Sequence, residues 1–431
     1  MGTRHRHVPA GLPAARRTRL RTLRERRQPS VVEHPVNWSA PLDEDSLHAG
    51  LIASSSRPTT VAGSRVVTQK EKPMAVLIAA TTVDAVDVEL ASAKPAHTVR
   101  HVPMAALRPR LVTDRVPLAG DVVLARVTEV GQHKRIELVG GRKADLFAGD
   151  TVLVAYGARY APDQYEAAIP DGLGPCQLVA AGGIAAVVQS SHAMMTTATQ
   201  LEPLGLLVDV DDRTVNLRDH APIVPRNVRQ PCGPPWTVLV AGTAMNAGKT
   251  TVAAHIVKGL SRMGYRVGAA KVTGTGSGGD TWLMRDAGAV RVVDFTDGGY
   301  ASTFQVPANE VTALAGALLD ELAAEPVDPV DAVVVELADG LLQTETAGLL
   351  ATPEFTGRVD AAVFAAGDAL GGVMGVQRLI DLGLPVRMAS GRFTAAPLAV
   401  REARAALGVP VVLSKDFAEP EVVGRLIAPA T

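Results

Sequence analysis

The chain has 431 residues, 47% of them hydrophobic and 20% charged, with a formal net charge of −1. This length exceeds what one hydrophobic core usually holds, and the balanced charge argues against electrostatic binding to nucleic acid or acidic membranes. Aromatic residues make up 3%, only two cysteines occur, and no run approaches the about 18 apolar residues of a membrane span, so a cytoplasmic protein without a disulfide framework is expected.

Residues 1–73 are predicted to be a basic tail and a linker. Nine arginines face one acid within residues 1–30, and the apolar core of a secretory signal is lacking. Residues 31–72 are rich in Ser, Pro, Thr and charge without periodicity, which is typical of a linker. A nucleic-acid-binding arm is an alternative for the basic segment. Another is translation from a start codon upstream of the true one, in which case Met74 would be a sensible start and chains beginning there should fold and function.

The next segment, 74–218, is predicted to be a smaller β-rich or α+β domain. Short apolar or alternating runs separated by glycine-containing turns favour strands. These runs are 74–82, 121–130, 134–139, 150–156, 182–189 and 204–210. A loop at 156–166 holds three of the five tyrosines beside Arg159, Asp163 and Glu166, so it either closes over a substrate or packs as a surface loop. The isolated His133 and His192 are interpreted as surface or core residues.

Five prolines within 219–235 predict a stiff linker, after which the pattern changes to strand, loop and helix. Val-rich runs alternating with helices indicate a parallel sheet covered on both faces. Strands are predicted at 236–241, 265–271, 290–294, 331–337, 359–365, 385–389 and 410–413. Helices are predicted at 250–263, at 309–324 and at 395–407, and a further helix is predicted to follow the strand at 359–365 and to end at 382. Asn309 is the predicted N-cap of the helix at 309–324. The fold class is therefore α/β, with a P-loop domain at 236–431.

The strongest motif, VLVAGTAMNAGKTT at 238–251, lies between a predicted strand and a predicted helix. In this context loop N–H groups and the helix N-terminus hold phosphates, a lysine neutralises them, and a hydroxyl reaches Mg²⁺. The strict pattern requires a glycine six residues before the lysine, where this chain has Thr243; the glycine stands one residue earlier, at Gly242. The predicted nucleotide-binding residues are Gly242, Thr243, Asn246, Ala247, Gly248, Lys249, Thr250 and Thr251.

The spacing of this loop and of the acids after it resembles dethiobiotin synthetase. Lys271 is followed by VTGTGSGGD, ending at Asp280, and Glu336 ends a later Val-rich strand. The resemblance implies that Asp280 and Glu336 are Mg²⁺ ligands together with Thr250, and that Lys271 faces an acceptor substrate. The stretch 279–289 also resembles the molybdopterin-guanine dinucleotide adapter GTPases. The family's glycine after the strand glutamate is replaced by Leu337, and Asp339 is an additional acid.

The residues also support these acids without the resemblance. A carboxylate at the end of a buried parallel strand, as at Glu336, lies where such sheets bind ligands. Asp280 follows a glycine-rich loop, where a core-facing acid would be hard to satisfy. The alternatives are a solvated strand end for Glu336 and a helix cap for Asp280. Arg392 follows a late strand, where this class recognises the base, and it could also meet phosphate.

The sequence thus predicts an enzyme that uses ATP and Mg²⁺ to transfer phosphate to a small-molecule acceptor, as a kinase (a transferase), or to activate it, as a ligase. Lys249, Lys271 and Glu336 are the predicted catalytic residues, and Asp297, Ser302 and Thr303 could contact the acceptor. A nucleotide-dependent switch or adapter is one alternative. An acyltransferase that retains a P-loop is another, because the two-domain layout is similar to the D-glutamate N-acetyltransferase-like family. Homodimers are common in the resembling families, so a homodimer is an expectation.

Overall fold

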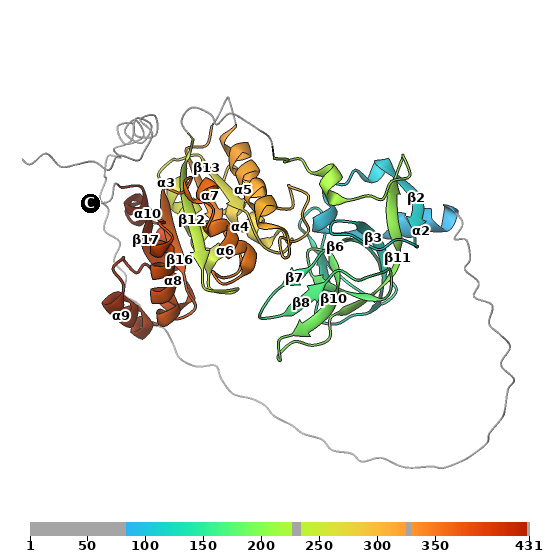
Figure 1. The fold of residues 1–431 in the computed structure, drawn as a ribbon, viewed down its shortest axis with the longest axis horizontal. Coiled ribbons are helices and arrows are strands. Elements are labelled where there is room, and N and C mark those ends of the chain that lie inside the picture. Colours follow the sequence, from blue (N-terminus) through green and yellow to red (C-terminus); the bar gives the residue numbers. More distant parts are fainter. Residues whose placement is uncertain (1–82, 226–233, 325–328, 429–431) are drawn as a thin grey trace, which may run out of the picture. The chain divides into compact units, whose positions relative to one another are not determined.

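The computed structural model describes residues 83–225, 234–324 and 329–428, and these belong to one compact unit. The predicted tail and linker at 1–73 and the predicted strand at 74–82 lie outside the described residues, as does most of the proline-rich segment. Two large sheets follow each other along the chain (Figure 1). None of the helices in the described ranges is long and apolar enough to cross a membrane.

The first sheet is mixed and lies within residues 94–209. Nine strands of the described chain form it in the order β1-β6-β3-β11-β9-β10-β8-β7, with β2 on β11. An additional parallel pairing of β6 with β10 closes β6, β3, β11, β9 and β10 into a ring. The strands are β1 (Lys94–Pro95), β2 (Leu107–Val112), β3 (Val122–Glu129), β6 (Thr151–Tyr156), β7 (Arg159–Tyr160), β8 (Tyr165–Ala168), β9 (Cys176–Ala180), β10 (Ile184–Ser191) and β11 (Thr199–Asp209).

A separate pair of short strands, β4 (Arg135–Glu137) and β5 (Lys143–Asp145), accompanies this sheet. Helix α2 (Val83–Ser92) precedes it, and the short turns η1 (His97–Val99), η2 (Met104–Ala106) and η3 (Leu217–His220) connect its parts. Buried residues of β3 and β6 lie on both faces of the sheet, so β6 and the first half of β3 do not alternate between buried and exposed positions. The segment is thus a β-rich region, as the sequence predicts.

The second sheet is wholly parallel, in the order β14-β13-β15-β12-β16-β17. Its strands are β12 (Trp236–Gly242), β13 (Val267–Lys271), β14 (Arg291–Asp294), β15 (Ala332–Glu336), β16 (Ala361–Ala365) and β17 (Val386–Ser390). All residues of β12, β13, β15 and β16 are buried, because helices cover both faces. Strand β12 lies between β15 and β16. The loop that follows β12 is therefore at a topological switch point, where parallel sheets commonly bind ligands.

One face of the parallel sheet packs on helices α5, α6, α8 and α9 in a shared apolar core, and α3 packs on the other side with α10. Figure 1 shows these helices gathered around the strands of the parallel sheet. The helices are α3 (Lys249–Arg262), α4 (Gly279–Asp286), α5 (Ala308–Ala323), α6 (Thr344–Leu350), α7 (Pro353–Thr356), α8 (Ala369–Asp381), α9 (Pro397–Ala406) and α10 (Pro420–Ile427), with the turns η4 (Arg392–Ala395) and η5 (Ser414–Ala418). The structure therefore has the predicted α/β fold class with a preceding β-rich region.

Two local predictions are wrong. Asn309 does not cap α5, because Pro307 occupies the cap position and Asn309 lies inside the helix; Glu310 is in the first turn as predicted. Residues 410–413 do not form a strand, since Val411 makes only an isolated parallel bridge to Ala389. The last expected strand is therefore a single contact beyond β17.

Candidate functional site

The phosphate-loop motif forms the connection between β12 and α3. Gly248 is the residue before α3 and has φ 96°, a left-handed conformation that a side chain would strain. Asn246 also has a positive φ of 61°, so the loop turns sharply twice before the helix begins. Thr243 binds the neighbouring strand through its backbone N–H, which donates to Ala365 O at 3.0 Å. The loop is thus held between the central strand and the first turn of α3.

The lysine of this loop is buried rather than extended into solvent. Lys249 is 5% exposed, and its Nζ donates to the carbonyl of Ala244 within the loop at 2.6 Å. Burial lowers the pKa of Lys249, and the carboxylates of Glu336 and Asp339 oppose that effect. A buried ammonium with only partial compensation is stabilised by an anion placed in the same loop.

Four of the predicted residues meet at the carboxyl ends of the neighbouring strands β13 and β15. Lys271 is in register with Glu336 across the two strands, and its ammonium forms an ion pair with Asp280 of α4. The hydroxyl of Thr250, in the first turn of α3, donates to Glu336 Oε1 at 2.8 Å. Residues from four different elements are therefore brought to one end of the sheet beside the phosphate loop.

Charge within this cluster is unevenly compensated. Burial raises the pKa of Glu336 to about 7, and the ammonium groups of Lys271 and Lys249 counteract only part of that rise. Burial acts against the charge of Lys271, but the carboxylates of Asp280 and Glu336 outweigh it and raise the pKa of Lys271. For Asp280, burial is outweighed by Lys271 and by the Thr250 hydroxyl, which hold its pKa below the usual value. Shifted values of this kind are common at functional sites.

Glu336 has an oxygen that a ligand could use. The residue is 1% exposed, and its Oε2 is buried without a hydrogen-bond partner. Within the described ranges, no group of three or more His, Cys, Asp or Glu side chains is placed to hold a metal. Mg²⁺, however, retains several waters and needs only one or two carboxylates with a hydroxyl. Thr250, Asp280 and the orphaned oxygen of Glu336 are hard oxygen donors that fit this ion.

The other predicted nucleotide-binding residues surround the loop. Gly242 ends β12, and Ala247 is buried beside Arg392, whose backbone N–H donates to Ala247 O at 2.9 Å. The Arg392 side chain itself is exposed, as is that of Thr251 in the first turn of α3. Asp280 is not a helix cap, because Gly278 occupies that position and the carboxylate binds Lys271 instead.

The tyrosine-rich segment of the β-rich region reaches the phosphate loop. Asp163 accepts a hydrogen bond from Asn246 Nδ2 at 2.6 Å, and the ring of Tyr160 lies 5.5 Å from that of Phe304. Arg159 is buried, with Nη2 donating to Gln164 at 2.7 Å and with Nε and Nη1 unpartnered. The alternation of β7 directs Arg159 and Tyr160 to opposite faces, so Tyr160 is the side chain of this pair that contacts the parallel-sheet region.

The polar residues at 297–303 have structural partners. Asp297 accepts from His101 at 2.7 Å and from Arg100 at 2.6 Å, while Ser302 Oγ accepts from the Phe304 N–H and Thr303 Oγ1 from the Gly274 N–H. The Ser302 bond is local, as in an ordinary turn, whereas the bonds of Asp297 and Thr303 join segments that are distant in sequence.

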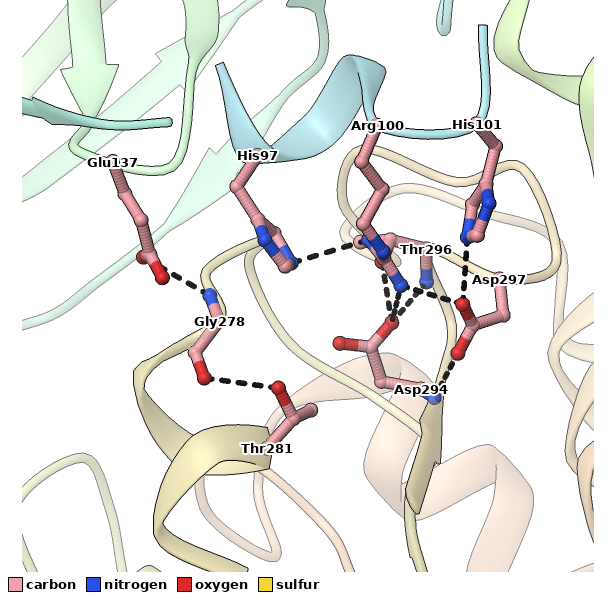
Figure 2. A network of polar contacts seen from close by, with 9 residues as sticks. All are labelled: His97, Arg100, His101, Glu137, Gly278, Thr281, Asp294, Thr296 and Asp297. Carbon is pink, nitrogen blue, oxygen red and sulfur yellow. Dashed lines mark hydrogen bonds and ion pairs between the residues drawn. The ribbon is translucent and has the colours of Figure 1, made fainter. Parts of the chain in front are cut away.

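The sequence did not predict the residues of the β-rich region that form hydrogen bonds with the segments after β13 and β14. Glu137, Arg100 and His101 contact segments at or after the ends of β13 and β14, and His97 is hydrogen-bonded to Arg100 (Figure 2). Isolated charged residues within short strands carry no sequence motif. The predicted strand at 134–139 contains Glu137 but also Lys134 and Arg135, so nothing in the sequence singles out Glu137.

Comparison with known proteins gives one family match. Residues 238–338, which include the loop, Lys271, Asp280 and Glu336, match the MobB family, described as molybdopterin guanine dinucleotide synthesis protein B. The match covers less than half of the chain. No curated protein sequence matches.

Similar solved structures share little sequence with the chain. The signal recognition particle receptor FtsY from Elizabethkingia anophelis in complex with GDP is 11% identical, with 50% of this chain and 70% of that chain covered at a TM-score of 0.31. The 54 kDa signal recognition particle protein from Aeropyrum pernix, also with GDP, is 20% identical, with 46% and 47% covered at 0.31. A DUF1611 family protein from Anabaena variabilis is 16% identical, with 48% and 62% covered at 0.33. Nothing further rests on these three structures. The family match and the observed parallel sheet together show that the C-terminal region is P-loop NTPase-like.

Proposed function

We propose that the chain binds a Mg²⁺–nucleoside triphosphate at the phosphate loop and transfers its terminal phosphoryl group to a small acceptor, or activates the acceptor for ligation. The observation that carries this proposal is the cluster of Lys249, Lys271, Asp280 and Glu336 at one end of the parallel sheet, with Glu336 Oε2 unpartnered. Buried charges with incomplete partners are costly, so their gathering at the mouth of one loop favours a charged ligand.

The nucleotide phosphates would occupy the loop after β12. Its backbone N–H groups and the N-terminus of α3 supply hydrogen bonds and a favourable dipole. The Lys249 ammonium, now on the Ala244 carbonyl, is close enough to the loop interior to exchange that weak acceptor for a phosphate oxygen. The negative phosphate would oppose the burial that lowers the pKa of Lys249.

Thr250, Asp280 and Glu336 would hold Mg²⁺, which supplies charge neutralisation for the phosphates. Lys271 has a separate task in this scheme. Lys271 is buried, yet its ammonium keeps its charge through Asp280 and Glu336, so it presents a fixed positive charge beside the metal ligands. A charge fixed in this way would orient an acceptor and stabilise negative charge that develops during transfer.

Nucleotide binding is tested with Lys249→Ala and a matched control on the same helix, Lys258→Ala, whose side chain is exposed. Calorimetry with ATP, GTP, ADP and GDP, each with Mg²⁺ and with a chelator, identifies the preferred base and the metal dependence. Losing one charged hydrogen bond should weaken triphosphate binding by roughly 10- to 150-fold, while the control binds normally. Equal affinities in Lys249→Ala and the unchanged protein would overturn the nucleotide site.

Transfer to a small acceptor is tested by screening metabolites for stimulation of nucleotide hydrolysis, followed by mass spectrometry of the products. The proposal expects a phosphorylated or ligated product whose formation requires Lys271. Hydrolysis that no small molecule stimulates, but that a protein partner does, would replace transfer with the second candidate below.

A nucleotide-dependent switch is the second candidate function. The hydrogen bond from Asn246 in the phosphate loop to Asp163 of the β-rich region favours it, because nucleotide binding would alter a contact between the two sheets. A change in the hydrogen-exchange rates of residues 156–166 on adding triphosphate, but not diphosphate, would support this candidate.

A further inference from the structure

A buried carboxylate of the β-rich region accepts hydrogen bonds from residues at the start of α4. Glu137 ends β4 and is 1% exposed. Its Oε2 accepts from Ser277 Oγ and from the Gly278 N–H, both at 3.1 Å, and its Oε1 accepts from Trp282 Nε1 at 3.2 Å. Figure 2 shows this carboxylate directed at Gly278, just before the first turn of the helix.

The chemistry of a helix start explains why a carboxylate suits this position. The first N–H groups of a helix have no partner within the helix, and the dipole there favours negative charge. Gly278, the residue before α4, has no side chain of its own to cap these groups. A Cβ at Gly278 would lie 2.5 Å from Glu137 Oε1, so the glycine makes room for a cap supplied from the other sheet.

The helix start held by Glu137 also carries Asp280. Asp280 is two residues after Gly278, in the first turn, and its carboxylate pairs with Lys271 beside Glu336. Any shift of residues 277–279 must therefore displace the Asp280 carboxylate relative to Lys271 and Thr250.

A second contact from the β-rich region restrains the adjacent loop. Arg100 Nη2 lies 2.6 Å from Asp297 and 3.3 Å from Asp294, and His101 Nε2 lies 2.7 Å from Asp297 (Figure 2). Asp294 ends β14 next to β13, and its charge helps raise the pKa of Lys271. The β-rich region thus forms hydrogen bonds or ion pairs with the loops that follow both β13 and β14.

We infer that Glu137 is a positioning residue, which holds Asp280 in place to serve as a Mg²⁺ ligand by capping the first turn of α4 from the β-rich region. This inference rests on the proposed function, because it assigns Asp280 to the metal. The β-rich region then completes the nucleotide site without touching nucleotide.

The test replaces Glu137 by glutamine, which keeps the shape of the side chain. An amide has one acceptor oxygen and places an NH₂ group against at least one of the three donors, so the cap cannot be kept intact. The matched control is Asp145→Asn on β5 of the same two-stranded sheet. The Asp145 side chain is 72% exposed, and its ion pair with Arg135 is long, at 3.7 Å. Both changes remove one charge from one small element.

The measured quantity is the Mg²⁺ concentration that half-saturates the metal-dependent part of triphosphate binding. Loss of a supporting partner behind a metal ligand typically weakens metal binding by about 10- to 100-fold, so Glu137→Gln should raise this concentration by that factor. Affinity for the nucleotide in chelator should stay unchanged, because Lys249 and the loop are intact. Asp145→Asn should match the unchanged protein in both measurements.

Hydrogen exchange provides a readout that needs no ligand. In Glu137→Gln the amides of residues 278–282 should exchange at least about tenfold faster, the change that accompanies a loss of about 1.4 kcal/mol of local protection, with β12 and β16 unaffected. Trp282→Phe, which removes one donor but keeps a ring, should give a smaller change in the same direction. It also serves as the test variant if Glu137→Gln does not fold.

Asp280→Asn separates the inference from the proposed function. If Asp280→Asn leaves the Mg²⁺ requirement unchanged, the metal assignment in the proposed function is wrong. If Asp280→Asn raises the half-saturating Mg²⁺ concentration but Glu137→Gln and Trp282→Phe do not, the positioning role of Glu137 is overturned and the metal site stands.

Discussion

The two sheets use their buried polar residues in different ways. In the parallel sheet, Lys249, Lys271 and Glu336 gather at one end, and Glu336 retains an unpartnered oxygen. In the mixed-sheet region, buried polar residues are spread out rather than gathered, and both residues with unpartnered atoms, such as Arg159, and partnered ones occur. Asp121, for example, accepts from the Leu118 N–H at 2.8 Å and from Asn216 at 2.9 Å.

This difference follows from sheet topology. Parallel strands all present their carboxyl ends at the same edge, so residues from several strands converge there. In a mixed sheet the ends alternate, and a polar residue meets whatever loop lies beside it. The parallel sheet is therefore expected to carry the chemistry, and the β-rich region to contribute stability and support. Changes of similar size in the two regions should then have unequal effects on function.

The largest effect is expected from Glu336→Gln. Removing the carboxylate charge should lower turnover of the nucleotide by roughly 100-fold or more, the scale for one electrostatic contributor, while nucleotide affinity changes much less. Steady-state hydrolysis is measured beside calorimetry. Glu354→Gln, an exposed acid in α7, serves as the control. Unchanged turnover in Glu336→Gln would show that the acid is only a buried strand end.

The pH dependence of Mg²⁺–nucleotide binding should be the next largest effect. Burial raises the pKa of Glu336 to about 7, so the proton that competes with the metal is lost as pH rises through that value. Binding should therefore strengthen by about tenfold between pH 6 and pH 8, the factor for one proton released with a midpoint at 7. The increase should be absent in Glu336→Gln. A flat profile in the unchanged protein would contradict the role of this carboxylate.

The β-rich region should affect stability rather than turnover. Burial, aided by the charge of Arg159, lowers the pKa of His133 to about 4. The unfolded chain then takes up a proton near pH 6.5 that the folded chain refuses, so stability is complete above about 6.5 and falls towards pH 4. His133→Asn should remove this decline, which amounts to about 3 kcal/mol between pH 6.5 and pH 4, in denaturant titrations. His192→Asn, at an exposed site, should leave the decline in stability unchanged. A change in nucleotide turnover with His133→Asn would contradict the prediction that the β-rich region affects stability rather than turnover.

The smallest effect is expected where the regions meet at the phosphate loop. Asp163→Asn removes a negative charge next to Asn246, so it should tighten nucleotide binding by about twofold to fivefold, and less at high salt. Glu166→Gln, on the same hairpin and bonded to Ser190, is the control. Weaker binding in Asp163→Asn would mean that the carboxylate supports the loop rather than opposing the phosphates.

Much of the parallel-sheet region can be predicted from local sequence. The strand β12, the loop and α3 form a continuous motif, and Val-rich runs such as β15 fall within one or two residues of their predicted ends. The reason is that backbone conformation, burial and ligand geometry all act within a few residues there. The predicted cap at Asn309 is wrong because Pro307, two residues earlier, is also compatible with a helix start and occupies the N-cap position of α5.

The β-rich region could be predicted only as a class. Apolar runs predict its strands, but the closure of β6 onto β10 joins residues distant in sequence, and no local pattern encodes that pairing. The same holds for the contacts of Glu137 with Gly278 and of Asp163 with Asn246. Each joins two residues separated by at least 83 positions, so neither is visible until the chain has folded.

From the sequence alone follow the phosphate loop, the order of strands and helices around it, and the acids and lysines that end the strands. Tertiary structure decided which of these groups share one site, because burial and register set their distances and shift their pKa values. It also decided that Glu137, an unremarked acid in a short strand, caps the helix that carries Asp280. Local chemistry is written in neighbouring residues, whereas desolvation and long-range hydrogen bonds exist only between surfaces that folding brings together.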